Sequence, residues 1–354
     1  MYFDAPPNSA GANIQSMGSR FARFIKAFAS FVYDYVASSF NDGFTSSKSS
    51  YSLMRSCYSL SRGKSPQILS SLPRLLHPSK SRISVNTGLI VQSLKKHGNH
   101  KIDNPSVRVQ LLCQSLRNEL SAHPIYEVLQ NFEHGPEYAS IYSALVDSFR
   151  ASARLDFYRR DVVGSISAWE IISELKMVDI ADLYLGCDPI LTSIDSWYVV
   201  PFKGDVESAA IYSAAAQTYH YDMDWIKFVK FFVNLTDVDE SHGPFEYISD
   251  SHKVKNKGYY KDGRFENLLD QSLVIKATGP TGSMLIADTS GIHRDGRATS
   301  GFRHVLQVEF AVSSFGAKFQ YDSVYRECSR SVPWSKLPAE MARRKRMLQL
   351  FRRA

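Results

Sequence analysis

The chain has 354 residues, 44% of them hydrophobic, which is enough to bury a full core and predicts one large domain with extensions. Its four cysteines have no CxxC spacing, which excludes a disulfide framework and favours free thiols in a reducing compartment, the cytoplasm. The formal net charge of +7 is divided unevenly, with +10 on residues 1–110, −10 on residues 111–324 and +7 on residues 325–354.

Residues 1–82 are predicted to be a basic, Ser-rich N-terminal extension with one amphipathic helix. Residues 1–20 are rich in Pro, Gly, Ser and Asn and predict no regular structure. Residues 21–36 have aromatic side chains three and four positions apart, as in a helix with one apolar face. We expect this helix to pack on its own domain, while a weak contact with an anionic membrane surface is the alternative. Residues 38–71 are Ser-rich and predict a linker with little regular structure.

Residues 83–324 are predicted to form the main domain, and residues 325–354 a basic helical tail that is solvated or packs on that domain. Helices are predicted in the segments 111–120, 136–149, 165–175 and, within the tail, 338–353. Neither basic end contains a recognisable nucleic-acid-binding fold, so we expect an anionic partner but no specific nucleic acid. No apolar run approaches the roughly 20 residues that a membrane-spanning helix needs, and no signal peptide is recognisable.

Short strands follow the helices and alternate with turns rich in Gly and Pro. They are predicted over residues 192–201, 225–235, 245–249, 282–288 and 301–310. Strands of this length and spacing argue for a barrel or a double-sheet jelly roll. The predicted fold class is therefore α+β with a mainly β core, a double-stranded β-helix of the cupin-like type flanked by helices. One loop between strands is either a solvated surface loop or a lid that attracts an anionic substrate. Its basic residues are Lys253, Lys255, Lys257, Lys261 and Arg264.

His220, Asp222 and His293 are the candidate metal ligands and catalytic residues. Side chains at positions i and i+2 of a strand share one face, so His220 and Asp222 are placed to hold one ion. Two imidazole nitrogens and one carboxylate on one side of an ion leave the opposite positions open, which is the facial triad of non-haem Fe(II) oxygenases. For His220 and Asp222 alone, the alternative is a hydrogen-bonded structural pair.

Arg303 adds a candidate site for a carboxylate. A guanidinium group presents a planar fork that binds a carboxylate through two hydrogen bonds, which a lysine cannot do. Arg303 follows His293 by ten residues on the next predicted strand. It could hold the far carboxylate of a dicarboxylic cosubstrate whose near end chelates the metal. This is the arrangement of 2-oxoglutarate-dependent oxygenases, in which the open iron positions take the 2-oxo acid and then O₂.

Several blocks of the sequence resemble the phytanoyl-CoA dioxygenase family between about residue 90 and residue 319. The blocks are Gln217-x-x-His-x-Asp222, Lys230-Phe-Phe-Val-Asn-Leu-Thr-Asp-Val238, Gly243-Pro-x-x-Tyr-x-x-x-Ser-His-Lys253 and the Gly-Phe-Arg303 that follows His293. The resemblance implies that His220, Asp222 and His293 hold the iron. It also implies that Arg303 clamps 2-oxoglutarate.

Four further positions lie around this predicted site. Phe232 falls where the family often has an aromatic residue beside the cosubstrate. Asn234 shares that face of its strand and either bonds the cosubstrate or satisfies a buried backbone group. Gln217 contacts substrate, cosubstrate or neither. Arg294-Asp295 departs from the family, whose members often carry small residues there, so the founding enzyme's substrate is not carried over.

Three other histidines are not expected to be ligands. His242 is predicted to be solvated in a turn, and His252 to shape the mouth of the barrel. His304 follows Arg303 and so points to the opposite face of the strand.

The residues together predict a soluble Fe(II)- and 2-oxoglutarate-dependent dioxygenase that hydroxylates a small organic substrate, anionic if the basic loop is a lid. O₂ would be the oxidant, with ascorbate as reductant in vitro. One alternative is a non-catalytic jelly-roll binding protein with a vestigial metal site. Another is a cupin-type metal-dependent isomerase or hydrolase that uses the same ligands without 2-oxoglutarate. The sequence does not indicate an oligomeric state.

Overall fold

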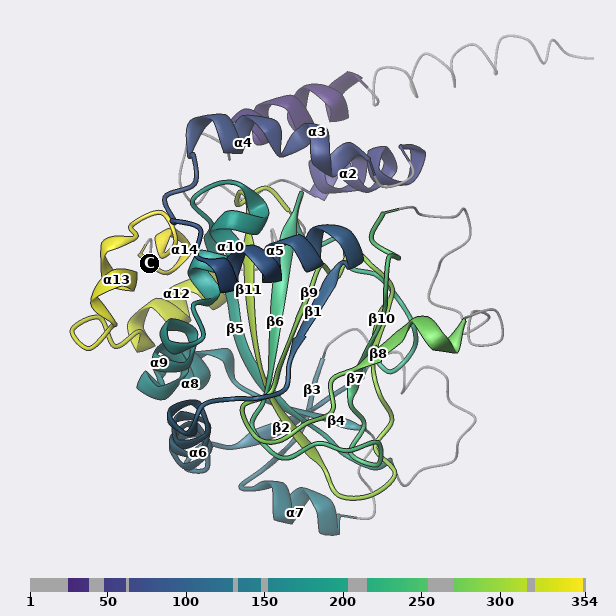
Figure 1. Ribbon diagram of the computed structural model, residues 1–354, viewed down its shortest axis with the longest axis vertical. Coiled ribbons are helices and arrows are strands. Elements are labelled where there is room, and N and C mark those ends of the chain that lie inside the picture. The colour runs from purple at the N-terminus through teal and green to yellow at the C-terminus, as the bar shows by residue number, and fades with distance from the viewer. Residues whose placement is uncertain are drawn as a thin grey trace, which may run out of the picture.

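Two antiparallel sheets of unequal size form the centre of the molecule, and helices cover the outer face of the larger sheet (Figure 1). The structure is a computed structural model. It describes residues 25–37, 48–61, 64–129, 133–147, 152–202, 215–253, 270–316 and 322–352. This combination of helices with a mainly β core agrees with the α+β class predicted from the sequence.

Neighbouring strands run antiparallel in both sheets. The larger sheet has the spatial order β1 (Asn99–Ile102), β9 (Met284–Ala287), β6 (Phe228–Asn234), β11 (Arg303–Ala311), β5 (Ile190–Val199), β4 (Arg154–Phe157), β2 (Ile125–Val128) and β3 (His134–Tyr138). The smaller sheet has the order β10 (His293–Asp295), β7 (Phe245–Ile248) and β8 (Val274–Lys276). The strands predicted from the sequence correspond to β5, β6, β7, β9 and β11.

The central strand β6 separates two environments. It is buried along its whole length, and its side chains Phe231 and Val233 belong to the large apolar core under the helices. Successive side chains of a strand face opposite sides, so Lys230 and Phe232 point the other way. There they line a cavity between the two sheets, together with Gln307, which lies opposite Phe232 on β11.

A second, smaller apolar cluster joins the two sheets. It combines side chains of the larger sheet with side chains of β7: Trp197, Val199, Phe232, Leu285, Ala287, Val305, Phe245 and Tyr247. The sheets therefore pack face to face, with the cavity beside this cluster.

Five helices of the main domain pack on the outer face of the larger sheet or beside it. They are α5 (Val85–His97), α6 (Val107–Leu120), α8 (Arg159–Gly164), α9 (Ile166–Glu174) and α10 (Met177–Leu185). The bounds of α5 follow from its ends. Ser84 and Thr87 form a capping box at its start, and Gly98 ends it with a φ of 76°, which a glycine adopts without strain.

The prediction of a single helix over residues 136–149 is wrong. Residues of this segment form β3 and then the short helix α7 (Ile141–Val146), which begins at a capping box of Ser140 and Ser143. β3 lies at the edge of the larger sheet. Pro136 lacks an N–H, and an edge strand tolerates this because no further strand beside it needs a donor.

The prediction of a structureless linker over residues 38–71 is also wrong for its described part. Three helices occupy the region: α2 (Lys48–Leu60), α3 (Ser65–Leu69) and α4 (Ser71–Leu76). Tertiary contacts stabilise them, because Met54 belongs to the large core and Ser50 donates a buried hydrogen bond of 2.5 Å to Asp34.

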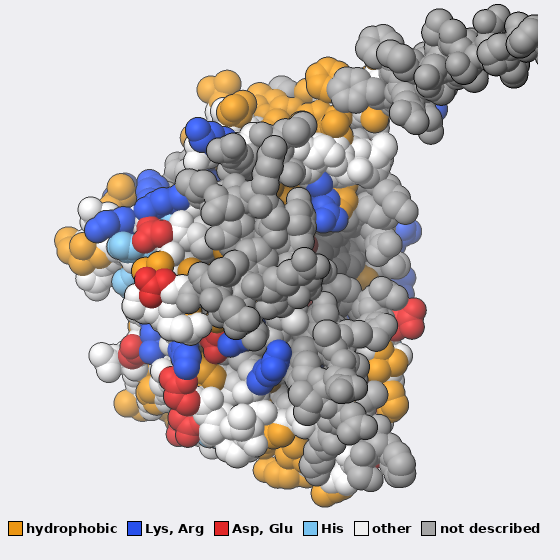
Figure 2. Space-filling model, turned by 90° about the vertical axis from the view of Figure 1, so that its right-hand side faces the viewer, with side chains coloured by type: hydrophobic (Ala, Val, Ile, Leu, Met, Phe, Trp, Pro, Cys, Tyr) orange, Lys and Arg blue, Asp and Glu red, His pale blue; other side chains and the backbone are white. Residues whose placement is uncertain are grey.

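Residues 25–37 are helical, as predicted, and pack on the domain through Phe31, whose ring meets Phe315 edge-on at 5.4 Å. The opposite side of this helix is exposed and apolar, as a contact with a membrane surface would require; its residues are Ile25, Phe28, Val32 and Val36. Hydrophobic side chains gather along the upper edge of Figure 2, over the N-terminal helices. None of the described helices is long and apolar enough to cross a membrane.

The C-terminal tail is broken into short pieces instead of the one helix predicted over residues 338–353. The pieces are α12 (Asp322–Ser331), α13 (Ala339–Arg343) and α14 (Gln349–Arg352). Between α13 and α14 the chain bends so that the carbonyl of Met347 accepts a hydrogen bond of 2.9 Å from Leu191 on β5. Leu348 and Phe351 then enter the large core. Burial of these side chains outweighs the local preference for a continuous helix.

Candidate metal centre

His220, Asp222 and His293 lie together at the edge of the smaller sheet. One potential ligand atom from each lies within 4.8 Å of the others. Nε2 of His220 is 3.7 Å from Oδ1 of Asp222, and Nε2 of His293 is 3.4 Å from Oδ2. The structure thus brings the three predicted ligands into one group.

Backbone pairing positions these ligands, although not as the sequence predicted. His220 and Asp222 do not belong to a continuous strand. Instead His220 forms an isolated bridge with His293, the first residue of β10, through two backbone hydrogen bonds of 2.9 Å. The amide of Asp222 donates to the carbonyl of Thr289 at 2.8 Å. Each ligand is therefore fixed by its own main chain.

Both imidazoles are oriented by backbone carbonyls. Nδ1 of His220 lies 2.7 Å from the carbonyl of Thr218, and Nδ1 of His293 lies 3.0 Å from that of Gly291. A carbonyl only accepts, so each Nδ1 carries a hydrogen and each Nε2 is left to face Asp222. Burial is the largest cause that lowers the pKa of His220, and the nearby His293 is the second. The pKa falls to about 4, so the imidazole of His220 is neutral at pH 7.

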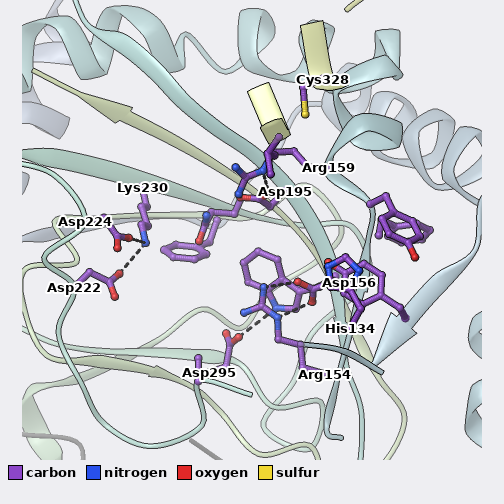
Figure 3. Close-up of a pocket in the computed structure, with 18 of the residues that line it drawn as sticks. His134, Arg154, Asp156, Arg159, Asp195, Asp222, Asp224, Lys230, Asp295 and Cys328 are labelled. Atoms are coloured by element: carbon purple, nitrogen blue, oxygen red, sulfur yellow. Dashed lines mark hydrogen bonds and ion pairs between the residues drawn. The ribbon is translucent and has the colours of Figure 1, made fainter. Parts of the chain in front are cut away.

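Lys230 is part of the site and was missed by the sequence reasoning. Its Nζ lies 2.7 Å from Oδ2 of Asp222 and 3.3 Å from Oδ2 of Asp224 (Figure 3). It also lies 3.2 Å from Oε2 of Glu309. Burial alone would raise the pKa of Asp222, but Lys230 and the two histidines hold it well below its usual range. The sequence did contain an indication of this role, because Lys230 is two residues from Phe232 and therefore shares its face of β6.

Arg303 is fully buried on β11 and forms an ion pair with Asp295 on β10. The bond joins Nη2 of Arg303 to Oδ1 of Asp295, and the indole N–H of Trp197 donates to Oδ2 of Asp295 at 3.2 Å. Asp295 lines the cavity together with the three candidate ligands, so Arg303 reaches the cavity through Asp295. Nε and Nη1 of Arg303 are buried and have no hydrogen-bond partner among the described residues.

The other three predicted site residues have three different surroundings. Phe232 lines the cavity and stacks on Phe245 at 4.0 Å. Asn234 donates to the carbonyl of Ala277 at 2.8 Å, so it satisfies a buried backbone group. Gln217 is buried, and in the part of the chain that the structure describes neither polar atom of its amide has a partner.

His242, His252 and His304, which were not expected to be ligands, are not among the residues that line the cavity. His242 is in a turn beside Asp239, and His252 approaches the carbonyl of Lys95 at 3.4 Å. His304 points to the opposite face from Arg303, as strand alternation predicted, and bonds Ser196 at 2.9 Å. Of the basic loop only Lys253 is described, and it pairs with Asp250; Lys255, Lys257, Lys261 and Arg264 lie outside the described residues.

The cavity has a volume of about 600 Å³, and one wall consists of paired charges. Arg154 and Asp156, two residues apart on β4, form two hydrogen bonds of 2.6 and 2.9 Å. Arg159 binds Asp195 of β5 in the same way, at 2.6 and 3.0 Å (Figure 3). The Arg154 guanidinium also stacks over Trp197 at 4.0 Å. Sequence reasoning missed this wall, because the pairing of Arg159 with Asp195 depends on how α8 packs against β5.

No family model matches the chain, and no curated protein matches it. Among solved structures, the non-heme alpha ketoglutarate dependent epimerase SnoN from nogalamycin biosynthesis is 10% identical over 64% of this chain and 82% of that chain, with a TM-score of 0.44. The corresponding carbocyclase SnoK is 13% identical over 65% and 84%, with a TM-score of 0.43. EctD from S. alaskensis, solved with 2-oxoglutarate and 5-hydroxyectoine, is 14% identical over 65% and 77%, with a TM-score of 0.43. At this low similarity the solved structures do not indicate a function for this chain, and the proposal below depends on the geometry of the site.

Proposed function

We propose that the chain is a non-haem Fe(II)- and 2-oxoglutarate-dependent dioxygenase that hydroxylates a small organic substrate. The observation that carries this proposal is the group formed by His220, Asp222 and His293. Two imidazole nitrogens and one carboxylate are the donor set of such iron centres. The residues fit the ion, because backbone carbonyls accept from both Nδ1 atoms and leave both Nε2 atoms to coordinate a metal.

Arg303 supports a 2-oxo acid with a second carboxylate as the cosubstrate. Its buried Nε and Nη1 lack partners among the described residues, and an unsatisfied buried N–H of a charged group costs about 1–3 kcal/mol or more. A carboxylate of a ligand would satisfy one of these donors together with Nη2. Phe232 and Phe245 would supply an apolar surface beside it.

When bound, Fe(II) would activate O₂, which is the oxidant, and 2-oxoglutarate would supply two electrons as it is oxidised to succinate and CO₂; the protein supplies binding, orientation and exclusion of water. His220, Asp222 and His293 would hold the ion, and Arg303 would orient the distal carboxylate. Trp197 and the other aromatic side chains of the inter-sheet cluster exclude water from one side of the cavity.

The charged wall supports a polar substrate. Arg154–Asp156 and Arg159–Asp195 present both signs of charge to the cavity, in hydrogen-bonded pairs. A molecule that carries hydrogen-bonding groups of both kinds matches such a wall better than an apolar one does.

The two facing sheets support a double-stranded β-helix as the fold of the main domain. We assign residues 83–324 to this domain, residues 1–82 to the N-terminal extension and residues 325–354 to the tail. The extension and the tail would act as supports for the domain, since both contribute side chains to its core.

The decisive experiment measures succinate formed without added substrate, in the presence of Fe(II), ascorbate, O₂ and 2-oxoglutarate. We expect slow succinate formation by the wild type, none by His220→Ala and an unchanged rate for the turn variant His242→Ala. Arg303→Gln should raise the KM for 2-oxoglutarate sharply, a change that a 2-oxoglutarate-independent isomerase or hydrolase would not show. A wild type that retains no metal and forms no succinate would contradict the proposal.

A non-catalytic binding protein is the second candidate, and two ion pairs favour it. Lys230 binds the carboxylate of a candidate ligand, and Asp295 binds the candidate clamp. Both pairs stabilise the site without a metal or a cosubstrate. The metal content of the purified protein separates the two candidates, because a vestigial site would remain empty when Fe(II) is supplied.

A further inference from the structure

Asp295 lies between the candidate metal centre and Arg303, because it lines the same cavity as the ligands and pairs with Arg303. It lies two residues after His293 on β10, and its amide donates to the carbonyl of Ala216 at 2.9 Å, which fixes its main chain. Its side chain is 3% exposed and lines the cavity. Trp197 and Arg303 each donate to one of its two carboxylate oxygens.

The bond to Asp295 uses Nη2 of Arg303, the nitrogen that takes part in both of the positions where a guanidinium can bind a carboxylate. A guanidinium group offers two forks to carboxylates, one formed by Nε and Nη2 and the other by Nη1 and Nη2. Nη2 has two hydrogens and contributes one of them to each fork, and Asp295 accepts one of the two. Nε and Nη1 stay buried without partners among the described residues. A carboxylate from a ligand therefore finds one fork partly taken by Asp295, and it meets the other fork beside the negative charge of Asp295.

The charges of the surrounding residues oppose the arrival of another anion. Asp295 balances Arg303, and Asp156 balances Arg154, whose guanidinium stacks on Trp197 next to Asp295. With all four charges present, this end of the cavity is neutral. A ligand carboxylate would add a negative charge close to that of Asp295, in a buried place where like charges repel strongly.

We propose that Asp295 is an internal competitor for the cosubstrate site: its carboxylate holds Arg303 until the distal carboxylate of 2-oxoglutarate displaces it. Asp295 is thus a residue that sets the affinity and the selectivity of this site. The inference rests on the proposed function, since it takes 2-oxoglutarate as the ligand. It predicts weak discrimination by the wild type between 2-oxoglutarate and an analogue that lacks the distal carboxylate.

The first experiment uses the wild type and needs no turnover. Binding of 2-oxoglutarate and of 2-oxopentanoate, in which a methyl group replaces the distal carboxylate, is measured by calorimetry with Mn(II) in place of Fe(II). We expect the wild type to prefer 2-oxoglutarate by less than about tenfold, because the gain from Arg303 is offset by the loss of Asp295. A preference above about tenfold overturns the inference.

The second experiment removes the competing charge. Asp295→Asn keeps the shape of the side chain, and we expect the Kd for 2-oxoglutarate to fall about tenfold, with little change for 2-oxopentanoate. Asp156→Asn is the matched control, because it removes the same charge from the same cavity but from another guanidinium. A fall below roughly threefold in Asp295→Asn, or an equal fall in Asp156→Asn, overturns the inference. The wild-type comparison stands by itself if Asp295→Asn does not fold.

The two proposals fail in different ways. If Mn(II) binds and 2-oxoglutarate binds to neither the wild type nor Asp295→Asn, the proposed function is wrong and the inference falls with it. If 2-oxoglutarate binds to both with equal Kd, the proposed function survives and Asp295 is only a structural partner of Arg303.

Discussion

The ammonium group of Lys230 lies 2.7 Å from Oδ2 of Asp222, the oxygen that faces Nε2 of His293 at 3.4 Å. One carboxylate oxygen is thus shared between a buried cation of the protein and a candidate metal ligand. Lys230 and a divalent cation would compete for this oxygen, and the positive charge of the lysine would repel the ion.

Replacing Lys230 should have opposite effects on the free protein and on metal binding. Lys230→Gln leaves the buried Glu309 without a cation, which should lower the free energy of unfolding by about 3–5 kcal/mol without metal. The affinity for Mn(II) should rise by about tenfold or more. Thermal unfolding with and without Mn(II) measures both. Lys227→Gln, three residues earlier on the other face, is the control; an unchanged Mn(II) affinity in Lys230→Gln would contradict the competition.

Metal should stabilise the folded protein through the three candidate ligands. At 100 times its Kd, a ligand that binds only the folded state adds about 2.7 kcal/mol to the free energy of unfolding. We expect Mn(II) to raise the Tm of the wild type and EDTA to reverse the effect. His293→Ala should lose the response and His242→Ala should keep it. A response of equal size in His293→Ala would place the ion elsewhere.

His304 should make the protein less stable at mildly acidic pH. Burial, followed by the charge of Arg117, lowers its pKa to about 3, whereas the unfolded state protonates near 6.5. The unfolded state therefore binds more protons between these values, and stability falls as the pH drops from 6.5 towards 3. The loss from this group should be about 2 kcal/mol at pH 5.

Urea unfolding of the wild type and of His304→Phe between pH 7 and pH 5 measures this effect. The aromatic replacement preserves the stacking with Tyr198, which lies 4.1 Å from the imidazole. We expect a flatter pH profile for the variant. Parallel profiles would show that His304 does not titrate on unfolding.

The C-terminal tail should contribute to stability as a part of the core. Phe351 is fully buried and meets the rings of Trp169 and Tyr325 edge-on, at 6.4 and 5.6 Å. Phe351→Ala should lower the free energy of unfolding by about 3–5 kcal/mol. The exposed Lys345→Ala in the same tail should change it by less than about 0.5 kcal/mol. Equal small effects of both substitutions would mean that the tail detaches before the domain unfolds.

Strands β5, β6, β7, β9 and β11 were predictable because they have a local pattern, whereas β1, β2, β3, β4, β8 and β10 were not predicted. β6 is rich in aromatic and β-branched residues, and β11 combines such residues with alternating polar ones after the turn at Gly301, so their positions followed from local sequence. The helices of residues 48–76 were missed because Ser is frequent there, although Tyr51, Met54 and Tyr58 of α2 have helical spacing. Their stability comes from distant partners, as in the bond between Ser50 and Asp34, and a sequence does not reveal these contacts.

The candidate site was predictable only in part, for a similar reason. His220, Asp222 and His293 have a spacing that suggests a common ligand, and the structure groups them. Arg303 was expected to be available to a ligand, but its partner is Asp295. That contact depends on β10 of the smaller sheet lying against β11 of the larger one, and the spacing of two charges along a chain does not reveal it.

Arg346 connects the last part of the chain to the strands of the cavity. Its guanidinium donates to the carbonyl of Asp188, just before β5, and at 2.7 Å to that of Val312, just after β11. These two strands carry Asp195 and Gln307 on the cavity wall and Arg303 behind it. Deleting residues 346–352 would therefore loosen the far ends of both strands, and a shortened protein could lose ligand binding although every residue of the site is still present.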